Sequence, residues 1–160
     1  MIRAIAAVSQ NNVFGDSKTN ALPWKNVYPE DLKFFWRKTV NSTLIFGRNT
    51  LSSFGSRALP KRRNILISRT DSDLPGIETF KSVEDALKHC SGDVWMIGGL
   101  KIYEESLRLA EELYITQIPE VIKGPELIYF PKINPQHYKL KEVIVIDEIK
   151  NLKCNVFSRV

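Results

Sequence analysis

The sequence has 160 residues and carries 23 Lys plus Arg against 18 Asp plus Glu, a formal net charge of +5. Hydrophobic residues make up 43% and charged residues 26%, which is ordinary for a globular chain and excludes a disordered one. This length predicts one domain over residues 1–160. No apolar run reaches the ~18 residues of a membrane-spanning helix, and the first residues lack the pattern of a secretory signal.

The cysteines and histidines show no metal-binding spacing. Cys90 and Cys154 lie far apart, neither belongs to a CxxC pair, and His89 and His137 add no ligand pattern. We therefore expect no metal site and a reducing, cytoplasmic compartment. A single disulfide is the alternative.

Four apolar runs rich in strand-forming residues predict strands at 2–8, 43–47, 64–68 and 93–97. The last three are nearly continuous in apolar character. Strands of a parallel sheet that is covered on both faces have this character.

Helical patterns lie between these runs. Residues 29–40 begin with proline and two acids, which favour a helix N-terminus. Ser82 and Asp85 form a capping box that predicts a helix to about His89. A further helix should follow Gly99 and end at about residue 109. A shorter helix should follow Arg48.

The C-terminal third has strand-like runs at 112–118, 138–147 and 152–159. The short turn before residue 152 predicts that the last two form an antiparallel hairpin. We therefore expect an α/β fold with one mostly parallel central sheet, an antiparallel C-terminal hairpin and helices on both faces. Residues 9–28 read as one long loop. Ligands of such sheets bind beyond the carboxyl ends of the parallel strands.

Asp31 is the first candidate for chemistry, because it begins an amphipathic helix beside Phe34 and Phe35. A carboxylate in these surroundings could hold a flat heterocycle through two parallel N–H bonds. The alternative is a solvated acid that only stabilises the helix N-terminus.

Glycine and basic residues mark possible anion sites. Gly98 and Gly99 join a strand to a helix and would let the backbone approach a phosphate, although a tight turn without ligand fits equally. Arg48, the run 61–63 and Arg69 flank neighbouring strands. They indicate two anion sites or, alternatively, a solvated basic surface. Trp24 lies in the polar loop and either contacts a ligand or anchors that loop to the core.

The order of the motifs along the chain is more specific than any one of them. Together they closely resemble dihydrofolate reductase over almost the whole chain. The segments that carry the resemblance are 5–15, 22–24 (LPW), 29–35, 45–50 (IFGRNT), 59–68 (LPKRRNILIS), 94–103 (VWMIGGLKIY), 112–118 and 129–131.

The resemblance implies NADPH-dependent reduction of 7,8-dihydrofolate to 5,6,7,8-tetrahydrofolate, in one-carbon and thymidylate metabolism, by an enzyme that antifolates target. Hydride passes from the nicotinamide to C6, and protonation of N5 makes C6 a better acceptor. The implied catalytic residues are Asp31, Trp24 and Thr116. Asp31 would bind the pterin 2-amino and N3 groups, and the proton would reach N5 through water.

The resemblance also implies two binding sets. The substrate set is Ala7, Leu32, Phe35, Phe54, Arg62, Ile97 and Tyr103. In it Arg62 grips the α-carboxylate of the glutamate tail. The cofactor set is Ala6, Phe14, Gly15, Gly47, Arg48, Asn49, Thr50, Ser68, Arg69, Gly98, Gly99, Leu100, Lys101 and Ile102. Three of its cations would read the 2′-phosphate and favour NADPH over NADH.

The sequence departs from the family pattern at several positions. Leu51 replaces a frequent tryptophan, Leu100 replaces a third glycine, and Asn49 replaces a basic residue. The segment 117–130 lacks an aspartate that often pairs with the first loop. The alternatives are a related pyrimidine reductase of riboflavin synthesis and a non-catalytic nucleotide-binding module. We expect a monomer with no nucleic-acid or membrane partner.

Overall fold

The computed structural model describes residues 1–17, 23–24 and 26–160. Its elements, in chain order, are β1 (Ile2–Val8), β2 (Val13–Asp16), α1 (Pro29–Thr39), β3 (Thr43–Phe46), α2 (Arg48–Ser53), β4 (Arg63–Ile67), β5 (Ile77–Phe80), α3 (Val83–Lys88), β6 (Val94–Met96), α4 (Leu100–Leu109), β7 (Glu112–Gln117), β8 (Leu127–Tyr129), β9 (Tyr138–Asp147) and β10 (Leu152–Arg159).

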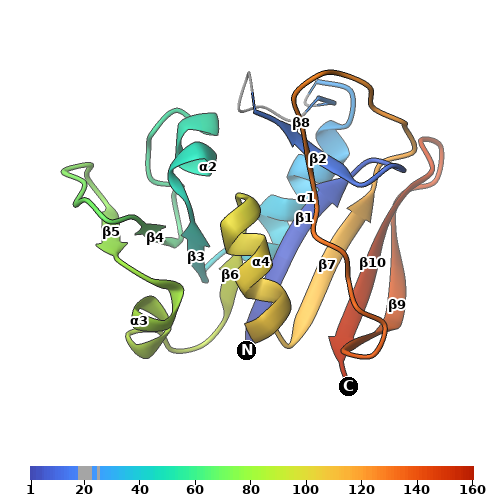
Figure 1. Cartoon of the computed structure of the whole chain (residues 1–160). Helices are drawn as coiled ribbons and strands as arrows, with labels where there is room; N and C mark the ends of the chain where they lie inside the picture. The colour runs from blue at the N-terminus through green and yellow to red at the C-terminus, as the bar shows by residue number, and fades with distance from the viewer. Residues whose placement is uncertain (18–22, 25) are drawn as a thin grey trace.

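An eight-stranded sheet forms the centre of the molecule, in the order β5-β4-β3-β6-β1-β7-β10-β9 (Figure 1). The neighbours from β5 to β7 pair in parallel. Strand β10 is antiparallel to both β7 and β9. The predicted sheet, parallel at first and ending in an antiparallel hairpin, is therefore confirmed.

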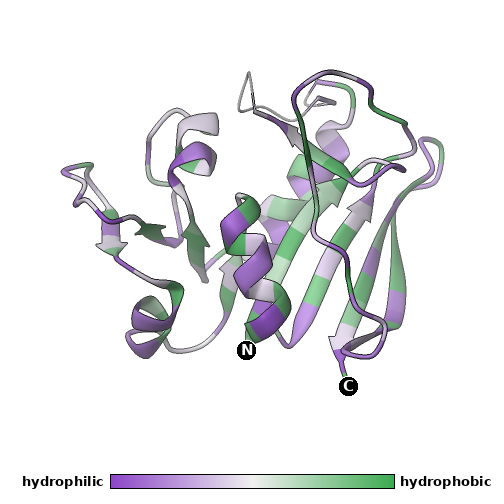
Figure 2. Ribbon diagram, in the orientation of Figure 1, coloured by the Kyte–Doolittle hydropathy of each residue, from purple (hydrophilic) through white to green (hydrophobic). Residues whose placement is uncertain are grey.

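Helices cover both faces of this sheet, with α4 on one face and α1 on the other (Figure 1). Successive residues of β1 separate accordingly: Ala4, Ala6 and Val8 belong to one apolar cluster and Ile5 to another. This alternation follows from the two-residue repeat of a strand. The central strands are hydrophobic while polar residues dominate the outer sides of the helices (Figure 2). The continuous apolar runs thus reflect burial on both faces.

The helices begin where the sequence predicts. Pro29 opens α1, and Ser82 Oγ accepts a 3.1 Å hydrogen bond from the Asp85 amide at the start of α3. Helix α4 follows Gly99 and has no side-chain cap. Its first amide groups therefore have no capping side chain.

Three short strands were not predicted. Strand β2 pairs with β8 in a separate two-stranded sheet, and β5 forms an edge of the main sheet. The interpretation of residues 9–28 as a single loop is thus wrong at residues 13–16. These strands have only three or four residues and mixed burial, so they carry no clear period-two pattern.

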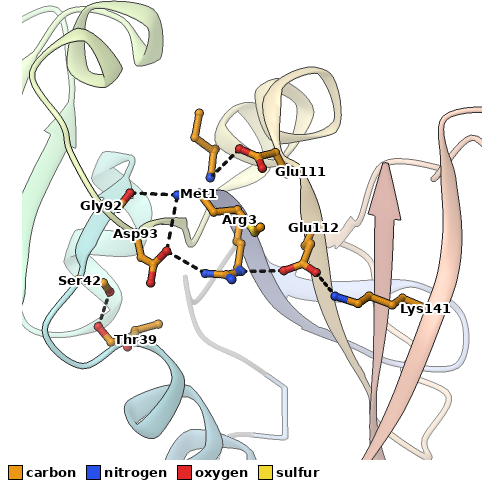
Figure 3. Close-up of polar contacts among 10 residues, drawn as sticks. Met1, Arg3, Thr39, Ser42, Gly92, Asp93, Glu111, Glu112 and Lys141 are labelled. Carbon is orange, nitrogen blue, oxygen red and sulfur yellow. Dashed lines mark hydrogen bonds and ion pairs between the residues drawn. The ribbon is translucent and has the colours of Figure 1, made fainter. Parts of the chain in front are cut away.

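Ion pairs join the amino ends of the central strands (Figure 3). Arg3 lies 3.1 Å from Asp93 and 2.8 Å from Glu112, and Lys141 lies 2.8 Å from the other oxygen of Glu112. Burial alone would raise the pKa of Glu112, but hydrogen bonds from Arg3 and Lys141 outweigh it and lower that pKa. The charged cluster stabilises the edge opposite to the site.

Both cysteines are free thiols, so the alternative of a disulfide between Cys90 and Cys154 is wrong. Among the residues that the structure describes, no helix is long and apolar enough to cross a membrane. In the same part of the chain, no group of three His, Cys, Asp or Glu residues is placed to hold a metal ion.

Candidate active site

Asp31 lies in the first turn of α1, and its carboxyl group is largely removed from solvent. Burial raises its pKa from 3.8 to about 6, and the Thr116 hydroxyl opposes part of that rise. Burial is the main cause of the raised pKa of Tyr103 and of Cys154, and the Asp31 charge adds to both shifts, so the two side chains lie within electrostatic reach of this carboxyl group. A carboxyl that titrates near neutral pH can hold or release a proton during a reaction.

Two buried polar atoms in this part of the fold lack a hydrogen bond of normal geometry within the described residues. Thr116 Oγ1 and Trp24 Nε1 are buried and make no regular hydrogen bond to any described residue, so Thr116 faces Asp31 without a bond of normal geometry. Thr116 lies opposite Ala7 in the β1–β7 register, and Trp24 packs in one cluster with Ala7. The three predicted catalytic residues therefore lie around the carboxyl end of β1. Buried polar groups of this kind are suited to a polar ligand.

The predicted wall of the substrate site is largely brought together. Phe35, Phe54 and Ile97 are partly buried and pack against one apolar cluster. The rings of Phe54 and Phe46 meet edge to face with centroids 5.3 Å apart. Leu32 is 50% exposed and leaves an apolar side chain open to solvent on α1.

Arg62 is anchored to the end of α1. Its Nε atom donates to Thr39 Oγ1 at 3.0 Å, and its terminal nitrogens donate to the carbonyls of Pro60 and Trp36. The guanidinium also lies over the Trp36 ring, 4.6 Å from the centroid. Since a guanidinium carries five N–H groups, three bonds leave two for a ligand. The arginine is held in place yet keeps donors for a carboxylate.

Tyr103 is held in place by hydrogen bonds to the backbone and by a ring contact. Its hydroxyl lies 2.9 Å from the Ile5 carbonyl oxygen and 3.0 Å from that of Ile97, and burial raises its pKa. The ring packs edge to face with Phe14, with centroids 5.2 Å apart. The Tyr103 hydroxyl is thus bonded to the backbone, and the side chain is buried.

Glycines create a close approach between three segments. Gly47 donates its amide to the Gly98 carbonyl at 2.8 Å, just before α2 and α4. Gly98 has φ +115, and a Cβ there would lie 3.1 Å from Thr50 Oγ1 and 3.2 Å from the Tyr103 ring. Only glycine fits this conformation and this space. The first amide groups of α4, which no side chain caps, lie next to Gly98 and are suited to bind a phosphate.

The predicted phosphate-binding group of cations is partly assembled. Arg48 Nε donates to Ser68 Oγ at 2.9 Å, and its Nη2 atom donates to Thr70. Asn49, Arg69 and Lys101 are exposed side chains. Arg48 and Ser68 therefore form one polar unit across the ends of β3 and β4. Thr70, which is not among the residues predicted from the sequence, belongs to it as well.

The remaining cofactor candidates lie in the same region of the fold. Ala6 and Ile102 are buried, Gly15 belongs to β2, and Leu100 is 40% exposed at the start of α4. The hydrogen bond of Tyr103 to Ile5, its ring contact with Phe14 and the Gly47–Gly98 hydrogen bond bring β1, β2 and the starts of α2 and α4 together.

A hollow of about 240 Å³ lies between α3 and α4, and the sequence predicts few of its residues. Its lining residues are Ile67, Lys81, Ser82, Val83, Glu84, Lys101, Ile102 and Glu105. Only Lys101 and Ile102 were predicted. The capping box at Ser82 indicated the start of a helix there, but nothing in it indicates that this helix faces α4.

The first loop is paired with residues 120–129 despite the missing aspartate. Gln10 donates its amide to the Glu120 carbonyl, Asn11 Nδ2 donates to that of Ile122, and Ser17 donates to that of Glu126. Backbone carbonyls therefore accept these hydrogen bonds without that aspartate. LPW begins at Leu22, outside the described residues.

Comparisons with known proteins agree with this arrangement. A family model described as dihydrofolate reductase matches residues 1–158. A dihydrofolate reductase of Buchnera aphidicola is 41% identical over 133 residues, covering 82% of this chain and 79% of the relative. That of Bacillus subtilis is 36% identical over 143 residues, covering 88% and 81%.

A solved structure of dihydrofolate reductase from Enterococcus faecalis, complexed with NADP(H) and RAB-propyl, is also similar. It is 32% identical, has a TM-score of 0.86 and covers 99% of this chain and 96% of its own. With the match of the family model over nearly all residues, these similarities show that the chain belongs to the dihydrofolate reductase family.

Proposed function

We propose that this chain reduces 7,8-dihydrofolate to 5,6,7,8-tetrahydrofolate with NADPH as the reductant. The observation that carries the proposal is the desolvated Asp31 carboxyl, with its pKa raised to about 6, which the buried Thr116 hydroxyl faces. Membership of the dihydrofolate reductase family supports this reaction over that of a related pyrimidine reductase or a non-catalytic module.

Asp31 would bind the 2-amino and N3 groups of the pterin, because an ionised carboxylate accepts two parallel N–H bonds. Its raised pKa keeps a proton available near neutral pH, which supports protonation of N5 through water. Thr116 Oγ1 and Trp24 Nε1 would complete their hydrogen bonding with the ligand or such a water. These residues orient the pterin and stabilise the protonated state.

The substrate tail would run along α1 to Arg62. The two free N–H groups of Arg62 suit a carboxylate, and its contacts with Thr39 and Trp36 fix its direction. Phe35 and Phe54 would flank the aromatic part of the substrate between these two polar ends. Tight positioning of both ends favours reaction because it removes the entropy of alignment.

The residues present fit a dinucleotide phosphate. Gly98 cannot carry a side chain, and the uncapped start of α4 offers amides to the pyrophosphate. Arg48 and Ser68, with Arg69 and Lys101, would hold the 2′-phosphate and favour NADPH over NADH. The hollow between α3 and α4 would take the adenine. When bound, NADPH supplies the hydride to C6.

We also propose that the protein acts as a cytoplasmic monomer without a nucleic-acid partner. The modest net charge of +5 supports this, because Arg48, Arg62, Arg69 and Lys101 serve a phosphorylated cofactor and a carboxylated substrate. Two free thiols suit a reducing compartment.

The decay of absorbance at ~340 nm on mixing the protein with NADPH and dihydrofolate tests this function, since reduced nicotinamide absorbs there. We expect oxidation of NADPH that depends on dihydrofolate, and a clear preference for NADPH over NADH. Oxidation only with a ribosylated pyrimidine substrate would favour the related reductase, and none with either would favour the non-catalytic module.

A further inference from the structure

Two acids in the hollow between α3 and α4 share one arginine. Arg108 Nη2 lies 2.9 Å from Glu84 Oε1 on α3 and 2.6 Å from Glu105 Oε2 on α4. Both glutamates line the hollow. The arginine thus links the two helices and holds the Glu105 carboxylate in one position, with its second oxygen still able to accept hydrogen bonds.

The rest of the lining suits a flat, weakly polar ring. Ile67, Val83 and Ile102 supply apolar surface, and Lys81 and Lys101 supply cations. Ile67 directly precedes Ser68, the partner of Arg48, so the hollow begins next to the anion-binding unit. A nucleotide whose phosphate binds Arg48 would therefore place its base in this hollow.

We propose that Glu105 makes the cofactor site selective for adenine by accepting a hydrogen bond from the exocyclic amino group of the base. This inference rests on the proposed function, which puts the adenosine half of NADPH in the hollow. A carboxylate only accepts hydrogen bonds. It pairs with the amino group of adenine and repels the carbonyl oxygen that hypoxanthine carries at the same position.

A purely structural role of the acids makes a different prediction. Glu105 and Arg108 are about half exposed, and exposed ion pairs contribute little to stability. If Arg108 and Glu105 only tie the helices together, removing Glu105 should change the stability slightly and leave the choice of base untouched. Base preference therefore separates the two roles.

Calorimetric titration with adenosine 2′,5′-bisphosphate and inosine 2′,5′-bisphosphate tests the inference without turnover. A hydrogen bond to a charged group predicts that the wild type binds the adenosine compound at least about tenfold more tightly. In Glu105→Ala the ratio should fall to about twofold or less, through weaker binding of the adenosine compound. Glu105→Gln should also lose the preference, because an amide can either accept or donate.

Glu104→Ala is the matched control, since Glu104 is exposed on the same helix and does not line the hollow. It should keep the wild-type ratio. A Glu105→Ala variant with that ratio, a wild type without preference, or a wild type that binds neither compound would each overturn the inference.

Steady-state assays separate this inference from the proposed function. NADPH and its hypoxanthine analogue should differ in KM in the wild type, and this difference should vanish in Glu105→Ala. Normal NADPH-dependent activity without any effect of Glu105 contradicts only the inference. A preference that depends on Glu105 in a protein unable to reduce dihydrofolate would contradict only the proposed function.

Discussion

The Nε atom of Arg62 donates a 3.0 Å hydrogen bond to Oγ1 of Thr39, the last residue of α1. The contact joins the start of β4 to the helix that carries Asp31 at its other end. It aligns the arginine with the far end of the proposed substrate site.

Replacing Thr39 with Val should therefore raise KM for dihydrofolate by about three- to tenfold, the scale of one lost hydrogen bond, with little change in kcat. Arg62→Ala should raise KM by tenfold or more, because a charged pair with the carboxylate is lost. Steady-state assays check both values. Dihydropteroate, which lacks the glutamate, is the control substrate, and an equal effect on its KM would contradict the role of Arg62.

Asp31→Asn should stabilise the folded protein at neutral pH. The pKa of Asp31 is raised to about 6, so the folded state must hold an unfavourable charge above that pH. The carboxyl costs no stability below its unfolded pKa, and the cost grows as pH rises through the folded pKa. We expect a gain of about 1–3 kcal/mol in the free energy of unfolding at pH 7 and almost none at pH 4. Urea unfolding at both pH values measures it; equal effects at both would contradict the raised pKa.

Gly98→Ala should impair both folding and cofactor binding. The added Cβ would lie 3.1 Å from Thr50 Oγ1 at a residue whose φ is +115. We expect a loss of about 2 kcal/mol or more in stability and at least a tenfold rise in KM for NADPH. Gly92→Ala is the control, because its φ is +74 but no atom lies within 4 Å of the added Cβ. It should lose stability through strain alone, and a similar rise in its KM for NADPH would argue against a role of Gly98 in cofactor binding.

Glu112→Gln should destabilise the protein at neutral pH far more than at acidic pH. The lowered pKa of Glu112 means that its charge contributes stability above the ordinary carboxyl pKa and loses it as pH falls through the folded value. Removing the charge leaves Arg3 with one acid fewer, at a cost of about 2 kcal/mol or more. Thermal unfolding against pH checks this, with exposed Glu104→Gln as control. A constant difference across pH would show that the charge is not responsible.

Much of the fold could be predicted from local patterns. The continuous apolar run at 43–47 predicts a strand because β3 is buried on both faces, and Ser82 marks the start of α3 because its side chain caps it. Strands β2, β5 and β8 could not be predicted in this way, because pairing with distant segments rather than their own pattern makes them strands.

The candidate site also contains residues that local sequence indicates and contacts that only the packing of the elements creates. Asp31 and the glycines Gly98 and Gly99 could be proposed as site residues from the sequence because their types and neighbours suit chemistry at an element boundary. The contact of Arg48 with Thr70 and the bridge from Arg108 to Glu84 join residues 22 and 24 positions apart. Such contacts depend on how helices and strands pack, which a single sequence does not show.

The pH dependence of dihydrofolate reduction in the wild type and Asp31→Asn tests the central claim most directly. The wild-type rate should fall as pH rises above about 6, and the variant should be at least ~10²-fold slower at pH 7, with a smaller deficit at low pH, where the solvent can protonate the substrate. A variant that retains nearly the wild-type rate across this range would contradict the assignment of Asp31 as the proton-supplying residue.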